Sequence, residues 1–209
     1  MILSRAEIPW SKARNPYDMH RAIWRLFPGE KHESRQAREQ PRQGFLFRVE
    51  DRRPGRPAQV LVQSKLPPQP DTRLHLVGSR EINPRPSPGQ RLAFILTANP
   101  IKTIKDEQAE AKPGKTRDTC RVPLLKEEAQ QAWLAQRLRD AADIEAVAVT
   151  THPPLYFRKD NRGGKIVCAT FEGIFRVLDP DALVALLENG IGPAKAFGCG
   201  LLLVRRIDS

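Results

Sequence analysis

A proline-rich segment divides the chain into two halves with the same predicted order of elements. Pro84, Pro86, Pro88 and Gly89 fall close together, and this composition favours an extended linker over a helix or a strand. The 209 residues of the chain allow two small domains that share an interface. We therefore expect a first domain over residues 1–82, a linker over 83–90 and a second domain over 91–209.

The N-terminal half contains the patterns of a strand, a helix and a hairpin. Residues 2–8 are typical of a strand, residues 16–27 of a helix, and residues 45–49 alternate between apolar and polar side chains. Residues 59–63 supply the return strand of a hairpin, and a further strand is expected over 74–77. The order strand, helix, hairpin, weak helix, strand is close to the ferredoxin-like order.

The C-terminal half repeats this order with clearer periodicity. A basic, polar stretch from Lys102 to Arg121 is expected to include an exposed loop. The other segments predict a strand, a helix, two strands, a helix and a strand over residues 92–98, 126–142, 144–150, 167–177, 180–188 and 201–204. The predicted fold is therefore α+β, with two tandem ferredoxin-like (βαββαβ) domains.

The charge of the chain points to a polyanionic partner. Lys and Arg number 35 against 24 Asp and Glu, a formal net charge of +11, which favours RNA or DNA first and an anionic membrane surface second. The apolar runs are far shorter than a membrane-spanning helix, and we expect no signal peptide. The three cysteines are scattered and have neither the pattern of a disulfide framework nor the spacing of a zinc site. We therefore expect the protein to reside in the reducing cytoplasm.

The predicted first helix has marked ends and two different faces. Asn15 is a good N-cap, Pro16 suits the first helical position, and Asp18 places a carboxylate in the first turn. Pro28 and Gly29 end the helix. Helical periodicity gives the helix one apolar face, formed by Met19, Ala22, Ile23 and Leu26. We expect a second face to turn away from the core, and its residues are Tyr17, His20, Arg21 and Trp24.

A glycine-rich segment over residues 190–200 has two interpretations. It lacks the Gly-Lys-Ser/Thr ending of a Walker loop, and it leads from a helix into a strand, the reverse of a dinucleotide fingerprint. Its four glycines could bring backbone N–H groups to a phosphate, with Gly192 and Lys195 as candidate contacts. The alternative is a helix C-cap followed by a tight turn.

Basic residues also cluster around a predicted hairpin tip. Arg158, Lys159, Arg162 and Lys165 surround Gly163 and Gly164, a pattern that suits contact with RNA phosphates and also suits an ordinary solvated turn. Lys102 and Lys105 are weaker candidates of the same kind, because a lysine in an exposed loop carries little information. Of the other histidines, His32, His75 and His152 are expected to be structural or solvent-facing, and Trp24 is expected to pack at the domain interface.

Four motifs occur together in the order of a known family. The helix with Tyr17, His20 and Arg21 is followed by Asn99-Pro100-Ile101-Lys102-Thr103, by Cys120-Arg121-Val122-Pro123-Leu124, and by the glycine segment 190–202. Together they resemble the CasE branch of the CRISPR RNA-processing endoribonucleases, which belong to the RAMP superfamily. The resemblance spans nearly the whole chain, although the charged segment 30–44 is longer than we expect for the family.

The resemblance implies a metal-independent nuclease without a cofactor, which cuts precursor CRISPR RNA at the base of the repeat hairpin. The ribose 2′-OH would attack, leaving a 2′,3′-cyclic phosphate and a 5′-OH, and the protein would stay bound as a subunit of the type I-E surveillance complex. The family's catalytic histidine matches His20, its assisting tyrosine matches Tyr17, and Arg21 falls at a position near the scissile bond. The basic hairpin would follow the RNA stem.

The residue types agree with this chemistry. The adjacent acidic pairs Asp106-Glu107 and Glu127-Glu128 would point apart on a helix, whereas a metal nuclease needs clustered carboxylates. An imidazole can move protons near neutral pH. His20 could act either as the general base or as the general acid. The positive N-terminus of the helix favours the neutral imidazole, and so weakly favours the role of base. Two alternatives remain, a catalytically silent stem-loop-binding subunit and a structural RNA protein of the ribosomal kind.

Overall fold

The computed structural model describes residues 1–28, 44–105, 119–159 and 162–207, except for the side chains of Lys159 and Arg162. The charged segment expected over residues 30–44 lies outside this part of the chain except for its last residue, and so does the Asp106-Glu107 pair.

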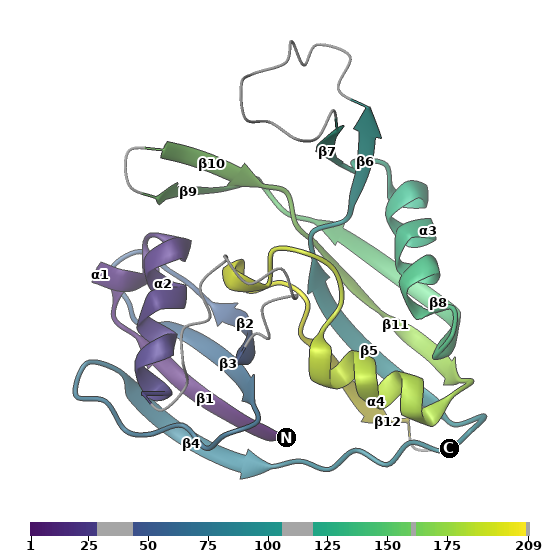
Figure 1. The fold of residues 1–209 in the computed structure, drawn as a ribbon, viewed down its shortest axis with the longest axis horizontal. Helices are drawn as coiled ribbons and strands as arrows, with labels where there is room; N and C mark the ends of the chain where they lie inside the picture. Colours follow the sequence, from purple (N-terminus) through teal and green to yellow (C-terminus); the bar gives the residue numbers. More distant parts are fainter. Residues whose placement is uncertain (29–43, 106–118, 160–161, 208–209) are drawn as a thin grey trace.

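Two four-stranded antiparallel sheets form the framework (Figure 1). The first sheet has the strand order β2-β3-β1-β4 and the second has the order β12-β5-β11-β8. When the strands of each sheet are renumbered along the chain, the first order reads 2-3-1-4 and the second, 4-1-3-2, is the same order from the other edge. This shared order confirms the prediction of two ferredoxin-like units. The strands are β1 (Ile2–Ile8), β2 (Phe45–Asp51), β3 (Ala58–Ser64), β4 (His75–Glu81), β5 (Arg91–Ala98), β8 (Ala142–Thr151), β11 (Ala169–Val177) and β12 (Leu202–Arg206).

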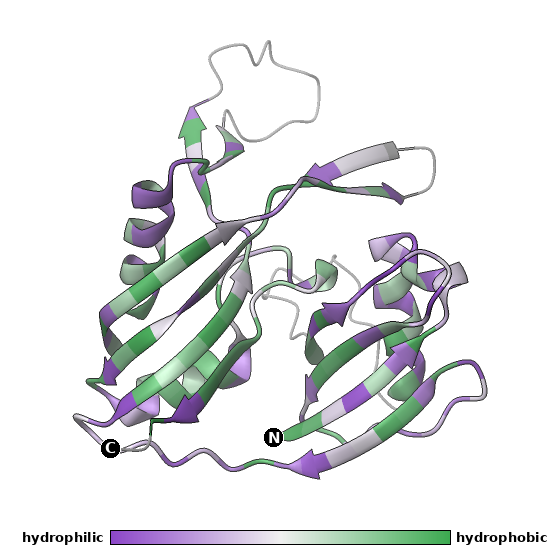
Figure 2. Cartoon of the chain, turned by 180° about the vertical axis from the view of Figure 1, so that it is seen from behind, coloured by the Kyte–Doolittle hydropathy of each residue, from purple (hydrophilic) through white to green (hydrophobic). Residues whose placement is uncertain are grey.

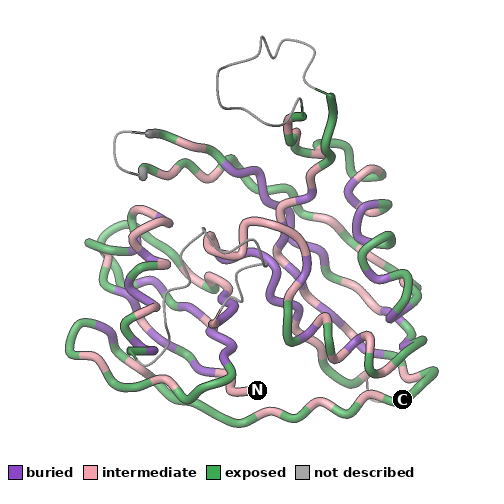
Figure 3. The backbone as a smooth tube through the Cα atoms, in the orientation of Figure 1, coloured by how far each residue is buried: buried purple, intermediate pink, exposed green. Residues whose placement is uncertain are grey.

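Helices cover one face of each sheet, as Figure 1 shows. In the first unit, α1 and α2 lead into the 3-10 turn η1, and the apolar face of α2 packs on the buried Phe45 and Phe47. In the second unit, α3 and α4 close a core around Phe171 and Phe175. Figure 2 shows hydrophobic residues along the strands and helices, and Figure 3 shows buried residues in the same elements. The helical elements are α1 (Trp10–Ala13), α2 (Pro16–Ile23), η1 (Trp24–Leu26), α3 (Glu127–Leu138), α4 (Pro180–Asn189) and η2 (Lys195–Phe197).

Two hairpins extend the second unit beyond the basic ferredoxin-like order. The predicted basic hairpin is confirmed as β9 (Leu155–Lys159) paired with β10 (Arg162–Ile166). A second hairpin, β6 (Ile101–Lys105) with β7 (Thr119–Pro123), was not expected, since residues 102–121 were predicted to include an exposed loop and no strands. Both hairpins project on the same side of the second sheet in Figure 1.

The sequence-based prediction was wrong in one further segment. Residues 65–74 contain no helix, whereas a weak helix was expected between β3 and β4. The prolines at positions 67, 68 and 70 explain this, because they remove backbone donors and disfavour helical dihedrals at the residues before them. Within the described residues, we find no helix that is long and apolar enough to cross a membrane.

Side chains from the first sheet contact the second unit directly. The buried Gln63 on β3 donates from Nε2 to the carbonyl oxygen of Leu187 on α4 at 2.6 Å. Arg48 on β2 donates to Thr97 Oγ1 on β5 at 3.2 Å, and burial lowers the pKa of this guanidinium. These bonds fix the orientation of α2, which packs on the same first sheet, relative to the second unit.

Candidate functional site

The N-terminal end of α2 is built as its sequence predicts, although α2 ends at Ile23 and the 3-10 turn η1 follows it. Asn15 caps it, with Oδ1 accepting from the Tyr17 N–H at 3.3 Å, and Pro16 occupies the first helical position. Asp18 lies in the first turn, and its Oδ2 accepts from Asn15 Nδ2 at 3.1 Å. Met19 and Ile23 are buried against the first sheet. Around the rest of α2, Tyr17 and His20 are half-buried and Arg21 is exposed.

The imidazole of His20 lies against aromatic rings. Its centroid is 5.4 Å from that of Phe45, 6.2 Å from that of Phe47 and 6.1 Å from that of Trp24. The expectation that His20 and Trp24 turn away from the core is therefore wrong, because both rings contact the aromatic core and both residues are half-buried. The described ring contacts of Trp24, with His20 and Phe45, lie inside the first unit. Packing on three rings restricts the orientations open to the imidazole.

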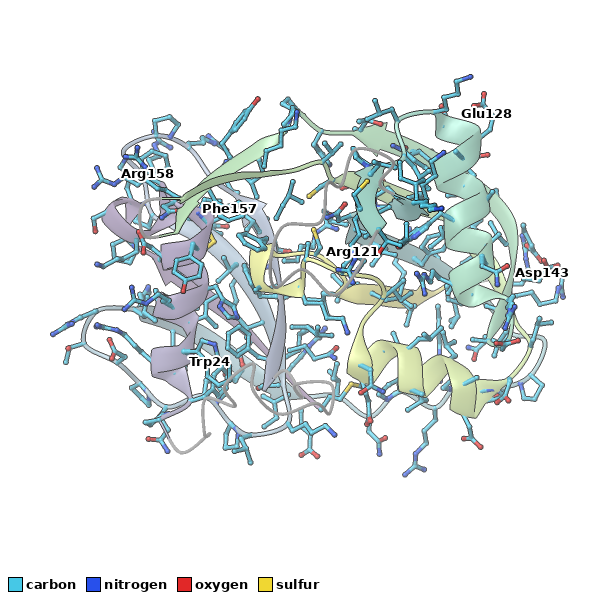
Figure 4. The ribbon with its side chains drawn as sticks, turned by 45° about the horizontal axis from the view of Figure 1, so that its top comes forward. Trp24, Arg121, Glu128, Asp143, Phe157 and Arg158 are labelled. Carbon is cyan, nitrogen blue, oxygen red and sulfur yellow. The ribbon has the colours of Figure 1, made fainter. Side chains whose placement is uncertain are left out.

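The basic hairpin of the second unit docks on the N-terminal end of α2. Asn15 Nδ2 donates to the carbonyl oxygen of Arg158 at 3.0 Å, and the Arg158 N–H donates to Asn15 Oδ1 at 3.4 Å. Figure 4 shows Phe157 and Arg158 beside α2, with Trp24 at the other end of the helix. The hairpin and the helix are thus joined within two residues of Tyr17.

A second contact holds the same hairpin to the glycine-rich segment. The rings of Phe157 on β9 and Phe197 in η2 have centroids 4.5 Å apart. Gly164 faces Phe157 across the hairpin, and a Cβ at this position would lie 2.3 Å from the Phe157 ring. The glycine therefore allows the ring to lie flat across the hairpin and to reach Phe197.

The glycine-rich segment has the geometry of a helix C-cap and a turn. Gly190 adopts a φ of 72° and ends α4, with its N–H bonded to the Leu186 carbonyl. The backbone N–H groups of four residues of the segment donate to its own carbonyls or to Thr97, namely those of Ile191, Phe197, Gly198 and Gly200. These four N–H groups are therefore engaged inside the protein.

The two residues of this segment that were predicted to contact a phosphate, Gly192 and Lys195, lie against other parts of the protein. Lys195 Nζ donates to the carbonyl oxygen of Asn189 at 2.6 Å, and burial lowers the pKa of this ammonium. At Gly192 a Cβ would lie 2.9 Å from the Trp133 ring. Lys195 thus satisfies a carbonyl at the end of α4, and Gly192 allows Trp133 to approach the backbone.

The other predicted basic residues divide between two places. Arg158 and Lys165 are exposed on the β9–β10 hairpin beside α2, whereas Lys102 and Lys105 are exposed on β6, which Figure 1 shows away from α2. The side chains of Lys159 and Arg162 lie outside the described part of the chain. His75 contacts Glu7 at 3.1 Å and His152 contacts Thr170 at 2.8 Å, as expected for structural residues, while His32 lies outside the described residues.

Sequence reasoning missed two features near the site. The role of Asn15 as a link to Arg158 could not be read from its capping pattern, because the two residues are 143 positions apart. Cys168 and Cys199, which looked scattered, lie with their sulfurs 3.3 Å apart and pack with Phe157 and Phe197. Among the described residues, no group of three or more His, Cys, Asp or Glu side chains is arranged to hold a metal ion.

Comparison with known proteins places the chain in a family. The family model described as "CRISPR associated protein" matches residues 1–206. The chain is 38% identical over 202 residues to the CRISPR system Cascade subunit CasE of Escherichia coli strain K12, covering 97% of this chain and 98% of that protein. It is 34% identical over 207 residues to the CRISPR-associated endoribonuclease Cse3 of Thermus thermophilus, covering 91% of this chain and 90% of that protein.

A solved structure agrees with these relatives in fold. The crystal structure of the CRISPR-associated protein Cas6e from E. coli K-12 superposes with a TM-score of 0.83 at 37% identity, covering 99% of this chain and 100% of that one. The sequence motifs, the strand order and the two relatives lead to the same assignment. The chain belongs to the CRISPR-associated protein family, in the group of CasE and Cse3.

Proposed function

We propose that this protein is a metal-independent endoribonuclease that cleaves precursor CRISPR RNA at the base of the repeat stem-loop. The observation that carries the proposal is the docking of the basic β9–β10 hairpin onto α2 through Asn15, because it brings exposed basic side chains close to the first turn of the helix that carries Tyr17 and His20. The family supports it, since one relative is named an endoribonuclease and another a Cascade subunit.

The reaction needs two proton transfers and stabilisation of charge. The 2′-OH before the cut attacks the phosphorus, its proton passes to a base, and the leaving 5′-oxygen takes a proton from an acid, giving a 2′,3′-cyclic phosphate and a 5′-OH. His20 and Tyr17, one helical turn apart, supply these two groups. Arg21 offsets the negative charge that develops on the phosphate.

The order of the proton transfers stays open. The positive N-terminal end of a helix would favour a neutral His20 and hence its role as the base. However, α2 ends at Ile23, and His20 lies in the last turn of the helix. That reason therefore no longer applies, because a helix dipole acts mainly within its first and last turns. Tyr17, in the first turn, and His20 remain a pair without assigned acid and base.

The RNA stem follows the β9–β10 hairpin. A-form RNA offers its phosphates to basic side chains more readily than its deep major groove, and the candidate contacts are Arg158, Lys159, Arg162 and Lys165. Lys102, Lys105, Gly192 and Lys195 are secondary candidates. After cleavage, the protein stays bound to the RNA as a subunit of the type I-E surveillance complex in the cytoplasm. We assign residues 1–82 and 91–209 to the two domains of this enzyme.

Substitution of His20 tests the proposal. His20→Ala should lower the cleavage rate by about 10²–10⁴-fold in the presence of EDTA, since it removes one proton-transfer group, and RNA binding should be retained. The matched control is His75→Ala, which removes an exposed histidine on β4. Mass spectrometry of the fragments should show the cyclic phosphate. Unchanged cleavage by His20→Ala, or a strict requirement for Mg²⁺, would refute the mechanism, and binding without any cleavage by the wild type would indicate a silent subunit.

A further inference from the structure

A concave basic surface lies on the side of α2 next to the Tyr17 and His20 face. It is a pocket of about 140 Å³ between α1, α2, η1 and the segment before β4. We call it the α2 basic pocket, and its lining consists of Lys12, Asp18, Arg21, Ala22, Arg25, Arg73 and Leu74.

The charge of the α2 basic pocket is not balanced within the described chain. Four cationic side chains, those of Lys12, Arg21, Arg25 and Arg73, surround one carboxylate. All four are exposed, and in the part of the chain that the structure describes none of them forms an ion pair. The carboxylate of Asp18 already accepts a hydrogen bond from Asn15. A concavity that gathers four cations favours an anion with several charges along its length.

The helix connects this pocket to the catalytic face. At about 100° per residue, Arg21 lies between the stripe that holds Tyr17 and His20 and the stripe that holds Asp18, Ala22 and Arg25. The basic hairpin docks at the N-terminal end of α2 through Asn15, whereas Arg25 follows its C-terminal end. The pocket therefore follows α2 from Asp18, next to the hairpin-docking Asn15, to Arg25 beyond the C-terminal end of the helix.

We propose that the α2 basic pocket binds phosphates of the single-stranded RNA that continues from the scissile bond on the side opposite the stem. This inference rests on the proposed function, which places the stem on the β9–β10 hairpin and the scissile bond at Tyr17 and His20. The strand then crosses Arg21 and reaches Arg25 and Arg73. The described residues that line the pocket include no aromatic side chain, so the strand is held by its phosphates and without preference for sequence.

A double substitution tests the pocket with a sequence-independent probe. Arg25→Gln with Arg73→Gln removes two phosphate contacts, and the probe is a fluorescently labelled oligouridine followed by anisotropy at several KCl concentrations. We expect the dissociation constant to rise at least about tenfold at low salt. A plot of the logarithm of the binding constant against the logarithm of the KCl concentration should have a slope that is shallower by about 1.4, which is about 0.7 for each lost phosphate contact.

The control must change the net charge equally. Arg205→Gln with Arg206→Gln removes two exposed arginines from β12, far along the chain from the pocket, and should leave the affinity within about twofold of wild type. Thermal melts of both variants should match the wild type, because all four side chains are exposed. An equal loss of affinity in the two variants, or no loss in either, would overturn the assignment.

Two further arms separate the possible explanations. Inorganic phosphate should displace the oligouridine no better than KCl at the same ionic strength, and stronger displacement would reassign the pocket to a small free anion. His20→Ala should bind the oligouridine as the wild type does. If the double variant lost affinity for oligouridine while His20→Ala still cleaved RNA, the pocket would be supported and the proposed mechanism refuted. The two proposals are therefore tested separately.

Discussion

Asn15 bonds through its side chain to both backbone polar groups of Arg158. Its Nδ2 donates to the Arg158 carbonyl at 3.0 Å, and its Oδ1 accepts from the Arg158 N–H at 3.4 Å. The same Oδ1 accepts from the Tyr17 N–H at 3.3 Å. One amide group therefore joins the hairpin of the second unit to the first turn of α2, which fixes the distance between the proposed stem-binding surface and the proposed catalytic pair.

Substitutions at Asn15 should separate helix capping from hairpin docking. Asn15→Ala should lower the free energy of unfolding by about 1 kcal/mol through the lost cap and should also slow cleavage. Asn15→Ser keeps a capping hydroxyl but is too short to bond to Arg158, so stability should recover while single-turnover cleavage stays slow. Equal cleavage rates for Asn15→Ser and wild type would contradict a positioning role. Urea unfolding and single-turnover cleavage are the two measurements.

The contact between Phe157 and Phe197 should matter for RNA binding more than for stability. Phe157→Ala removes an aromatic pair worth about 0.5–1.5 kcal/mol beyond its buried area and releases the hairpin from η2. We expect faster limited proteolysis within the hairpin and weaker binding of stem-loop RNA. Tyr156→Ala is the matched control, because Tyr156 is the preceding residue of β9 and is 70% exposed. The hairpin anchor would be refuted if both variants were cut by protease at the wild-type rate.

Substitution of Gly190 should be costlier than that of Gly55. Both residues have a positive φ, of 72° and 77°, which disfavours alanine at either position. At Gly190 the ψ of 164° also places the backbone in a region that is essentially restricted to glycine, where a side chain costs about 1–3 kcal/mol. A Cβ at Gly190 would also lie 2.8 Å from the carbonyl oxygen of Gly200 and 2.8 Å from Leu46, whereas at Gly55 nothing lies within 4 Å. Gly190→Ala should therefore lower the urea midpoint further, and a smaller effect than that of Gly55→Ala would contradict the close packing.

Acid should remove a stabilising contribution from Glu145. Hydrogen bonds from Arg91 and Arg176, each 2.7 Å long, hold the pKa of this carboxyl below its usual value. Because the folded-state pKa is the lower one, the contribution is present above the unfolded-state pKa, near about pH 4, and is lost as the pH falls through the folded-state value. Glu145→Gln should lower the melting temperature at pH 7, and the difference from wild type should shrink as the pH falls below the unfolded-state pKa.

A control and a contrary outcome complete this experiment. Glu188→Gln removes an exposed carboxylate on α4 and should leave the melting temperature unchanged across the same pH range. A difference between wild type and Glu145→Gln that stayed constant from neutral to acidic pH would show that the two arginines do not stabilise the ionised form.

Local sequence signals predicted the order of the elements. Asn15 with Pro16 and Asp179 with Pro180 mark the starts of α2 and α4, and the alternation of residues 92–98 marks β5. These signals depend on neighbours in the chain, so no tertiary information is needed. The helix α1 was not predicted, because its four residues have no side-chain cap. The strands β6 and β7 were not predicted, because both are short and thirteen residues separate them in the sequence.

The surroundings of the candidate site depended on distant contacts. His20 was identified from its position on α2, but its packing on Phe45 and Phe47 depends on how β2 lies under the helix. Lys195 is a predicted phosphate contact, and the bond of its ammonium to the Asn189 carbonyl depends on the fold of the turn after α4. Such contacts join residues whose spacing in the sequence gives no periodic signal.

The bond between Asn15 and Arg158 uses only the main chain of Arg158. Any non-proline residue at position 158 could make the same two bonds, so the side chains of the β9–β10 hairpin are not tied to the geometry of the helix. Under the proposed function, the basic side chains of the hairpin that contact RNA can therefore be exchanged without loss of the bonds to α2, whereas Phe157 and Gly164 are held by their own packing. The proposed recognition of RNA and the proposed reaction can thus change independently of each other.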